Sequence, residues 1–185
     1  MRIIMQVVLI ILIVSMGSVK CKKSKQVQVK FITISVIPNP KYVDSCEAGI
    51  TPGSNGLTGD LKAHLATDIT KDLSVELRFF MKNKQETEYK KFFTYDFELC
   101  KLMEGFMSQT VARLWAQSLK KFSNFPITCP IMQGDYYIKK MKIDRKSIPM
   151  VAINGIYMVK VFMYIKKELV RDAVANATLE AEVTL

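Results

Sequence analysis

Several segments of this 185-residue chain alternate apolar with polar residues, and this two-residue period restricts the fold more than any other feature. The pattern runs through residues 61–68, 75–82 and 93–99, where every second side chain apart from Thr67 is large and apolar or an alanine. Such alternation predicts β-strands with one dry face and one wet face. We predict that these three segments form an antiparallel meander.

Further segments have strand character. Residues 26–37 are rich in Val, Ile and Thr, and residues 136–138, 156–165 and 174–185 read as later strands. In the last of these, the apolar positions are Ala175, Ala177, Leu179, Ala181 and Val183. Residues 50–59 hold one proline and three glycines, so we predict a loop there.

Between residues 100 and 122 the period changes. Apolar residues recur there at steps of three and four, which predicts an amphipathic helix that ends before Pro126. The simplest role for its apolar stripe is to pack on the sheet. Seven or so strands and one inserted helix predict a mainly β protein, with two sheets around one core.

The first seventeen residues are typical of a secretory signal peptide. Arg2 precedes a run over residues 3–14 that is apolar apart from Gln6, and Ser15 and Gly17 supply the small residues of a cleavage site after Gly17. A retained membrane anchor is the alternative, but the run is shorter than the twenty or so residues that a spanning helix needs. We therefore expect a secreted, extracellular protein with a single domain over residues 18–185.

The formal net charge is +10. Because the Lys and Arg residues are scattered, they favour an ordinary solvated surface. The functional alternative is attraction to anionic lipid headgroups, acidic glycans or an acidic partner. Nucleic acid is not an expected partner for an exported chain without a recognition motif.

Four cysteines occur, at positions 21, 46, 100 and 129. In an oxidising compartment they predict two disulfides, with three possible pairings. None has the CxxC spacing of a zinc site, so we expect no metal and no cofactor. The tripeptide Asn176-Ala177-Thr178 is an N-glycosylation sequon.

The sequence contains no recognisable catalytic motif. His64 is the only histidine, and its strand position predicts an ordinary surface residue. Asp96 and Glu98 share a strand face, but such carboxylate pairs are unavoidable with seventeen acidic residues. We expect a protein that is not an enzyme.

The stretch from Tyr95 to Lys160 carries a family resemblance. Its motifs are Asp96-Phe97-Glu98-Leu99-Cys100, Cys129-Pro130, Gly134-Asp135-Tyr136 and Gly155-Ile156-Tyr157. Their order resembles the insect family of secreted proteins that carry domain of unknown function 1091, which is similar to the ML lipid-recognition superfamily and to Che-type chemosensory proteins. The resemblance implies a cup-shaped, immunoglobulin-like β-sandwich whose sheets part to hold a hydrophobic ligand. It also implies a Cys100–Cys129 disulfide, which leaves Cys21 to pair with Cys46.

Methionine and aromatic side chains suit an adaptable apolar pocket, although they equally suit a filled core. The residues that we predict to line a pocket are Leu77, Phe79, Phe93, Tyr95, Phe97, Phe106 and Trp115. The leading hypothesis is a secreted monomer that binds a lipid or another hydrophobic small molecule, with chemosensation as one role. The alternative is a secreted surface-interaction protein with a filled core, which serves as a receptor accessory factor or a basic membrane-active effector.

Overall fold

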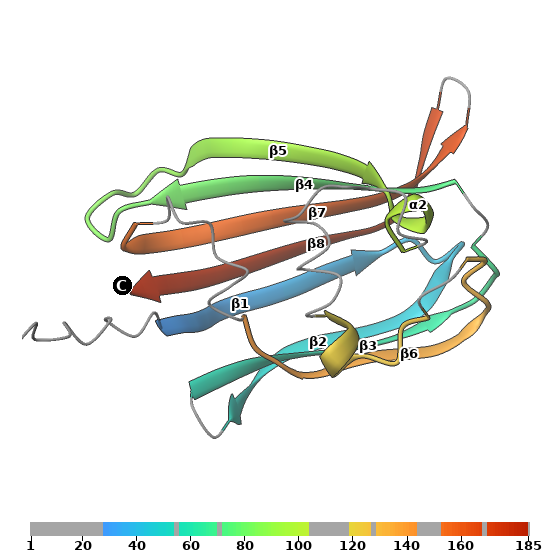
Figure 1. Cartoon of the computed structure of the whole chain (residues 1–185), viewed down its shortest axis with the longest axis horizontal. Helices are drawn as coiled ribbons and strands as arrows, with labels where there is room; N and C mark the ends of the chain where they lie inside the picture. Colours follow the sequence, from blue (N-terminus) through green and yellow to red (C-terminus); the bar gives the residue numbers. More distant parts are fainter. Residues whose placement is uncertain are drawn as a thin grey trace, which may run out of the picture.

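The computed structural model describes residues 28–53, 56–69, 72–103, 119–126, 129–143, 153–167 and 170–184. These residues form two antiparallel sheets (Figure 1). The five-stranded sheet has the order β1-β8-β7-β4-β5, and the three-stranded sheet has the order β2-β3-β6. The strands are β1 (Gln28–Pro38), β2 (Val43–Gly53), β3 (Gly56–Leu65), β4 (Leu73–Lys82), β5 (Lys90–Glu98), β6 (Gly134–Met141), β7 (Gly155–Lys167) and β8 (Val170–Thr184). The prediction of a mainly β, two-sheet protein is confirmed.

The predicted meander is wrong in one respect, because β3 does not pair with β4. β3 lies between β2 and β6 in the smaller sheet, whereas β4 pairs with β5 and β7. The chain changes sheets at the buried residue Ile69, which forms an isolated bridge with Ile131. Alternation reveals that a segment is a half-buried strand, but it does not identify the neighbouring strand.

The loop predicted over residues 50–59 is also wrong, and the strand β2 was missed. Residues 50–53 end β2, residues 56–59 begin β3, and Pro52 stands opposite Leu57 in the register. Proline is tolerated because β2 is an edge strand, where the missing N–H does not interrupt a ladder. Gly59 lies close to β1: a Cβ there would lie 2.6 Å from the end of the Ile34 side chain, which would have to shift to accept it.

The predicted helix begins where the sequence indicates. The helix α2 covers Leu99–Met103, residues 119–122 are helical, and residues 104–118 between them lie outside the described residues. Cys100 forms the expected disulfide with Cys129, with their Cα atoms 5.7 Å apart. This bond joins the start of the helix to the segment that follows it.

The larger of the two buried apolar clusters in the described residues closes one end of the molecule, next to α2 (Figure 1). Its buried members are Tyr42, Val43, Leu65, Ile69, Leu73, Ile131 and Val174, and Leu99 and Cys129 pack against them. The disulfide therefore lies against this core. Burial of these side chains, at about 25 cal/mol per Å² of apolar surface, holds the two sheets together at this end.

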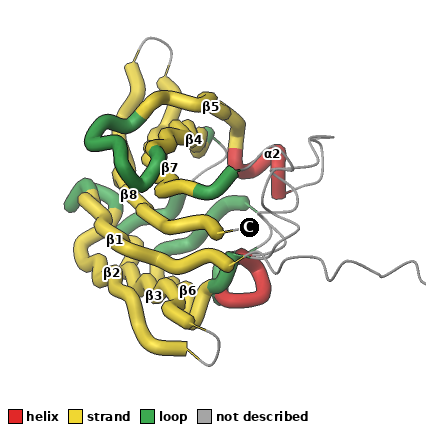
Figure 2. The backbone as a smooth tube through the Cα atoms, turned by 90° about the vertical axis from the view of Figure 1, so that its left-hand side faces the viewer, coloured by secondary structure: helices red, strands yellow, loops and turns green. Residues whose placement is uncertain are grey.

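The two sheets also meet along one side, where β1 lies against β2 and β3. At the opposite margins of the two sheets, β5 and β6 lie far apart (Figures 1 and 2). The sheets are therefore joined at one end and along one side, and they diverge toward β5 and β6.

Candidate ligand-binding face

The fold brings five of the predicted pocket residues together on the inner face of the five-stranded sheet, which faces the smaller sheet. Leu77 stands opposite Tyr95, Phe79 stands opposite Phe93, and Phe97 follows on the same face of β5. The rings of Phe79 and Phe93 stack with centroids 4.1 Å apart. Phe106 and Trp115, the two predicted helix residues, lie outside the described residues.

Sequence reasoning left out the part of this face that belongs to the central strands. Val159, Val161 and Met163 of β7 pack against the cluster formed by Val75, Leu77 and Phe79. Ala177 and Leu179 of β8 extend the face toward β1, opposite Val161 and Val159. The alternation of apolar and polar residues within 156–165 and 174–185 is the sequence signal that could have assigned these β7 and β8 residues to the inner face.

Many of these apolar side chains are only half-buried. In one row across the five strands, Val36, Ala177, Val161 and Tyr95 keep accessible surface, while Leu77 is buried. In the next row the half-buried residues are Ile34, Leu179, Val159 and Phe93. Side chains on central strands become fully buried when a facing sheet packs tightly on them. We call these two rows the accessible inner face.

The smaller sheet shows the same pattern on the side that faces β1. Leu61 and Ala63 of β3 and Ile138 of β6 are half-buried. Leu65, one step closer to the packed end, is buried. On each sheet the half-buried residues lie between two buried groups, since Phe31, Ala181 and Thr58 are buried farther from the closed end.

Near α2, the polar side chains on the outer face of the five-stranded sheet are strongly interconnected. Glu76 is only 7% exposed, which corrects the prediction of a wet face, because Arg78 Nε and Arg171 donate to it at 2.5 and 2.7 Å. The hydrogen bond from Arg78 and that from Arg171 lower the pKa of Glu76 against the opposing effect of burial. Nearby, the Tyr164 hydroxyl donates to Asp96 at 2.9 Å, and burial together with that bond raises the pKa of Tyr164.

His64 lies on β3 and forms an ion pair with Asp135 of β6, with Nδ1 and Oδ1 2.9 Å apart. The hydrogen bond with Asp135 raises the pKa of His64, and Asp44 contributes in the same direction. Glu98 forms a surface pair with Lys101 and is separate from the Asp96 contacts. Within the described ranges, no group of three or more His, Cys, Asp or Glu residues is placed to hold a metal ion.

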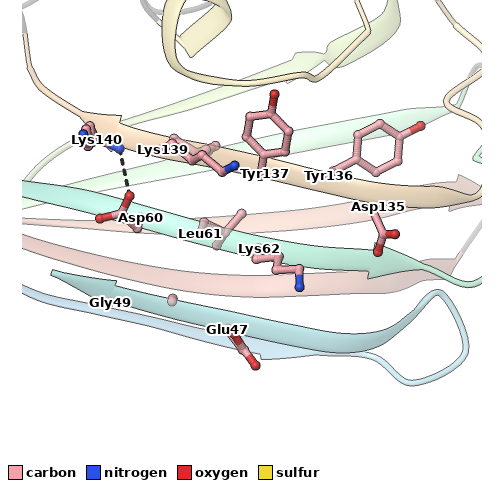
Figure 3. Close-up of a pocket in the computed structure, with 12 residues that line it drawn as sticks. Glu47, Gly49, Asp60, Leu61, Lys62, Asp135, Tyr136, Tyr137, Lys139 and Lys140 are labelled. Carbon is pink, nitrogen blue, oxygen red and sulfur yellow. Dashed lines mark hydrogen bonds between the residues drawn. The ribbon is translucent and has the colours of Figure 1, made fainter. Parts of the chain in front are cut away.

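An open hollow of about 590 Å³ lies over the smaller sheet (Figure 3). Half of its twelve lining residues are charged, among them Glu47, Asp60, Lys62, Asp135 and Lys139. Lys139 lies over the Tyr137 ring at 4.3 Å, and Asp60 accepts a hydrogen bond from the Lys140 amide at 2.8 Å. None of the predicted pocket residues lines this hollow, so it is not the apolar cavity that the ligand-carrier hypothesis requires.

The remaining predicted sites fall partly outside the described residues. Cys46 carries a free thiol whose pKa is raised by burial, and Cys21 lies outside the described residues, so their pairing stays a prediction. The predicted signal peptide also lies outside them. In the described ranges, no helix has the length and apolarity to cross a membrane. Asn176 lies in β8 on the outer face, between Ile37 and Phe162.

Comparison with protein families matches the part of the chain that contains β4, β5 and β6, whereas β1 and β8 lie outside the match. Residues 75–159 match a family described as Protein of unknown function (DUF1091), and this match supports membership of that family. It runs from β4 through α2 and the Cys100–Cys129 disulfide to the first half of β7. No curated protein matches the chain.

Proposed function

We propose that this chain is a secreted, non-enzymatic binding protein of ML-like fold that holds a lipid or another hydrophobic small molecule between its two sheets. The observation that carries the proposal is the accessible inner face, in which Val159, Val161 and Leu179 keep accessible surface although they lie on central strands. Apolar surface at the centre of a sheet is costly to leave in water, and a bound apolar molecule removes that cost.

The shape of the fold favours the same role. The packed core and the disulfide hold one end of the two sheets, while β5 and β6 lie apart at the other side. The aromatic residues Phe93, Tyr95 and Phe97 lie on β5, the strand at the margin of the larger sheet. A ligand that enters between β5 and β6 meets these rings first. Insect chemosensation is a role that suits such a carrier.

A dye-binding titration tests this proposal. The purified full chain is titrated with 1-aminoanthracene, a small apolar dye that fluoresces strongly when it leaves water. We expect saturable enhancement at one dye per chain and competition by long-chain fatty acids. Enhancement that does not saturate, or saturation that fatty acids leave unchanged, would count against the proposal.

The charged hollow over the smaller sheet supports a second candidate function. Lys62, Lys139 and Lys140 lie there beside Glu47, Asp60 and Asp135, which suits a polar protein partner better than an apolar ligand. In this alternative the chain is a receptor accessory factor that works through its surface. Charge reversal at Lys62 would then abolish receptor binding and leave dye binding unchanged.

A further inference from the structure

Asn176 occupies an unusual place on the outer face of the five-stranded sheet. It begins the sequon Asn176-Ala177-Thr178, and its neighbours across the sheet are Ile37 of β1 and Phe162 of β7. Its side chain forms no hydrogen bond with another residue in the described part of the chain. An amide that stands between two apolar residues and has no partner among the described residues gains no hydrogen bond from them.

The outer face is covered on both sides of this position. Toward α2, Arg171 pairs with both Glu76 and Asp96, and Asp96 accepts a hydrogen bond from Tyr164. Toward the other end, the turn between β4 and β5 folds over the sheet, since Tyr89 donates to Glu180 and Lys84 pairs with Glu182. The uncovered part between them holds Ile37, Ser35 and Thr178, and we call it the outer stripe.

The outer stripe contains one unusually exposed apolar side chain, Ile37. It is 70% exposed, more than any other large apolar side chain in the described residues. A single exposed isoleucine is ordinary on a surface, but this one stands beside a sequon asparagine that no described residue hydrogen-bonds. The hydroxyls of Ser35 and Thr178 lie opposite each other on the same face.

We propose that Asn176 carries an N-linked glycan whose first sugars lie on the outer stripe and cover Ile37. In the modification, the amide nitrogen of Asn176 forms a bond to C1 of the first N-acetylglucosamine of a lipid-linked oligosaccharide. The bond from that carbon to the lipid pyrophosphate breaks, and the amide loses a proton. The sugar then contacts Ile37 with an apolar ring face and binds the hydroxyls of Ser35 and Thr178. The outer face is thereby closed to partners, independently of what the inner face binds.

The test uses the full chain expressed in insect cells with its own N-terminus. The intact mass of protein from the medium is measured before and after treatment with peptide N-glycosidase. Thr178→Ala removes the sequon but keeps Asn176, and the matched control Thr178→Ser preserves the sequon. We expect a removable glycan mass on the wild type and on T178S, and none on T178A.

Hydroxyl-radical footprinting of the same folded sample then locates the sugars. Enzymatic removal of the glycan is expected to raise oxidation of Ile37 several-fold, while Ile153, exposed elsewhere, stays unchanged. An unmodified Asn176 in the medium, or a chain that never reaches the medium, would overturn the modification. A glycan whose removal leaves Ile37 oxidation unchanged would overturn its position on the outer stripe.

Discussion

Phe79 of β4 and Phe93 of β5 stack across the inner face of the larger sheet, with ring centroids 4.1 Å apart and ring planes 17° apart. Phe79 is buried, whereas Phe93 is half-buried. The pair therefore lies at the boundary between the packed core and the accessible inner face. Whether that face is empty of protein or merely loosely packed decides the function, and substitutions separate the two cases.

Ala177→Leu is the most informative substitution on the accessible inner face. If the space in front of Ala177 is open, the larger side chain enters it, changes the free energy of unfolding by less than about 0.5 kcal/mol, and obstructs the ligand. We predict near wild-type stability in urea denaturation and at least partial loss of dye binding. The substitution leaves the sequon intact.

Ala181→Leu is the matched control, since Ala181 lies on the same strand and face but is only 5% exposed. There the added carbons must displace packed neighbours, and we predict destabilisation by about 1–3 kcal/mol. Equal destabilisation by both substitutions would indicate a filled core and contradict the open inner face.

The Cys100–Cys129 disulfide closes a loop of 29 residues. Its removal by the double substitution Cys100→Ala and Cys129→Ala should lower the free energy of unfolding by about 3–4 kcal/mol, because the unfolded chain regains entropy. Urea denaturation without reductant measures the change. Met132→Ala, at an exposed side chain, is the control and should change stability by less than about 1 kcal/mol. A double variant as stable as the wild type would contradict a structural role for the bond.

Glu76→Gln should destabilise the protein by about 1–3 kcal/mol, because it removes a nearly buried carboxylate that accepts hydrogen bonds from two arginines. The folded-state pKa of Glu76 is lowered, so its stabilisation is present above its ordinary pKa of 4.5 and is lost as the pH falls through the folded pKa. In thermal unfolding, the melting temperature of the wild type should exceed that of E76Q at pH 5, and this difference should disappear as the pH is lowered further. Glu98→Gln, at a more exposed pair, is the control; an equal effect there would argue against the Glu76 contacts.

His64 is the only histidine, so a single pair of imidazole signals reports its titration in an NMR spectrum. Asp135 raises its pKa above the ordinary value, and Asp135→Asn should move it back down. Because the folded pKa is raised, the stabilisation from the pair is present below the ordinary pKa and is lost as the pH rises through the folded value. Identical titration of His64 in wild type and D135N would show that the pair does not form in solution.

Local patterns in the sequence predicted the parts of the fold that depend on neighbouring residues. The alternation in residues 75–82 and 93–99 placed Leu77, Phe79, Phe93, Tyr95 and Phe97 on one face, and the structure confirms that they meet. The change of period at residue 100 located the start of α2. The Cys100–Cys129 pairing came from the family resemblance rather than from spacing, and it is confirmed.

The parts that were wrong depend on contacts between distant residues. Residues 50–59 read as a loop because Pro52 and Gly59 are turn residues, but an edge position and a close approach by Ile34 make each of them acceptable in a strand. Glu76 read as a solvated side chain because nothing in its own strand reveals Arg171, which is 95 positions further along. The central-strand residues Val161 and Ala177 joined the site only once the strand order was known.

The central claim is that an apolar molecule occupies the space in front of the accessible inner face. The most direct measurement is mass spectrometry of lipids extracted with organic solvent from the protein secreted by insect cells, with A177L purified in parallel. The account predicts near-stoichiometric apolar molecules with the wild type and a marked loss with A177L. Recovery of no apolar molecule from well-folded wild-type protein, or equal recovery from both proteins, would contradict it.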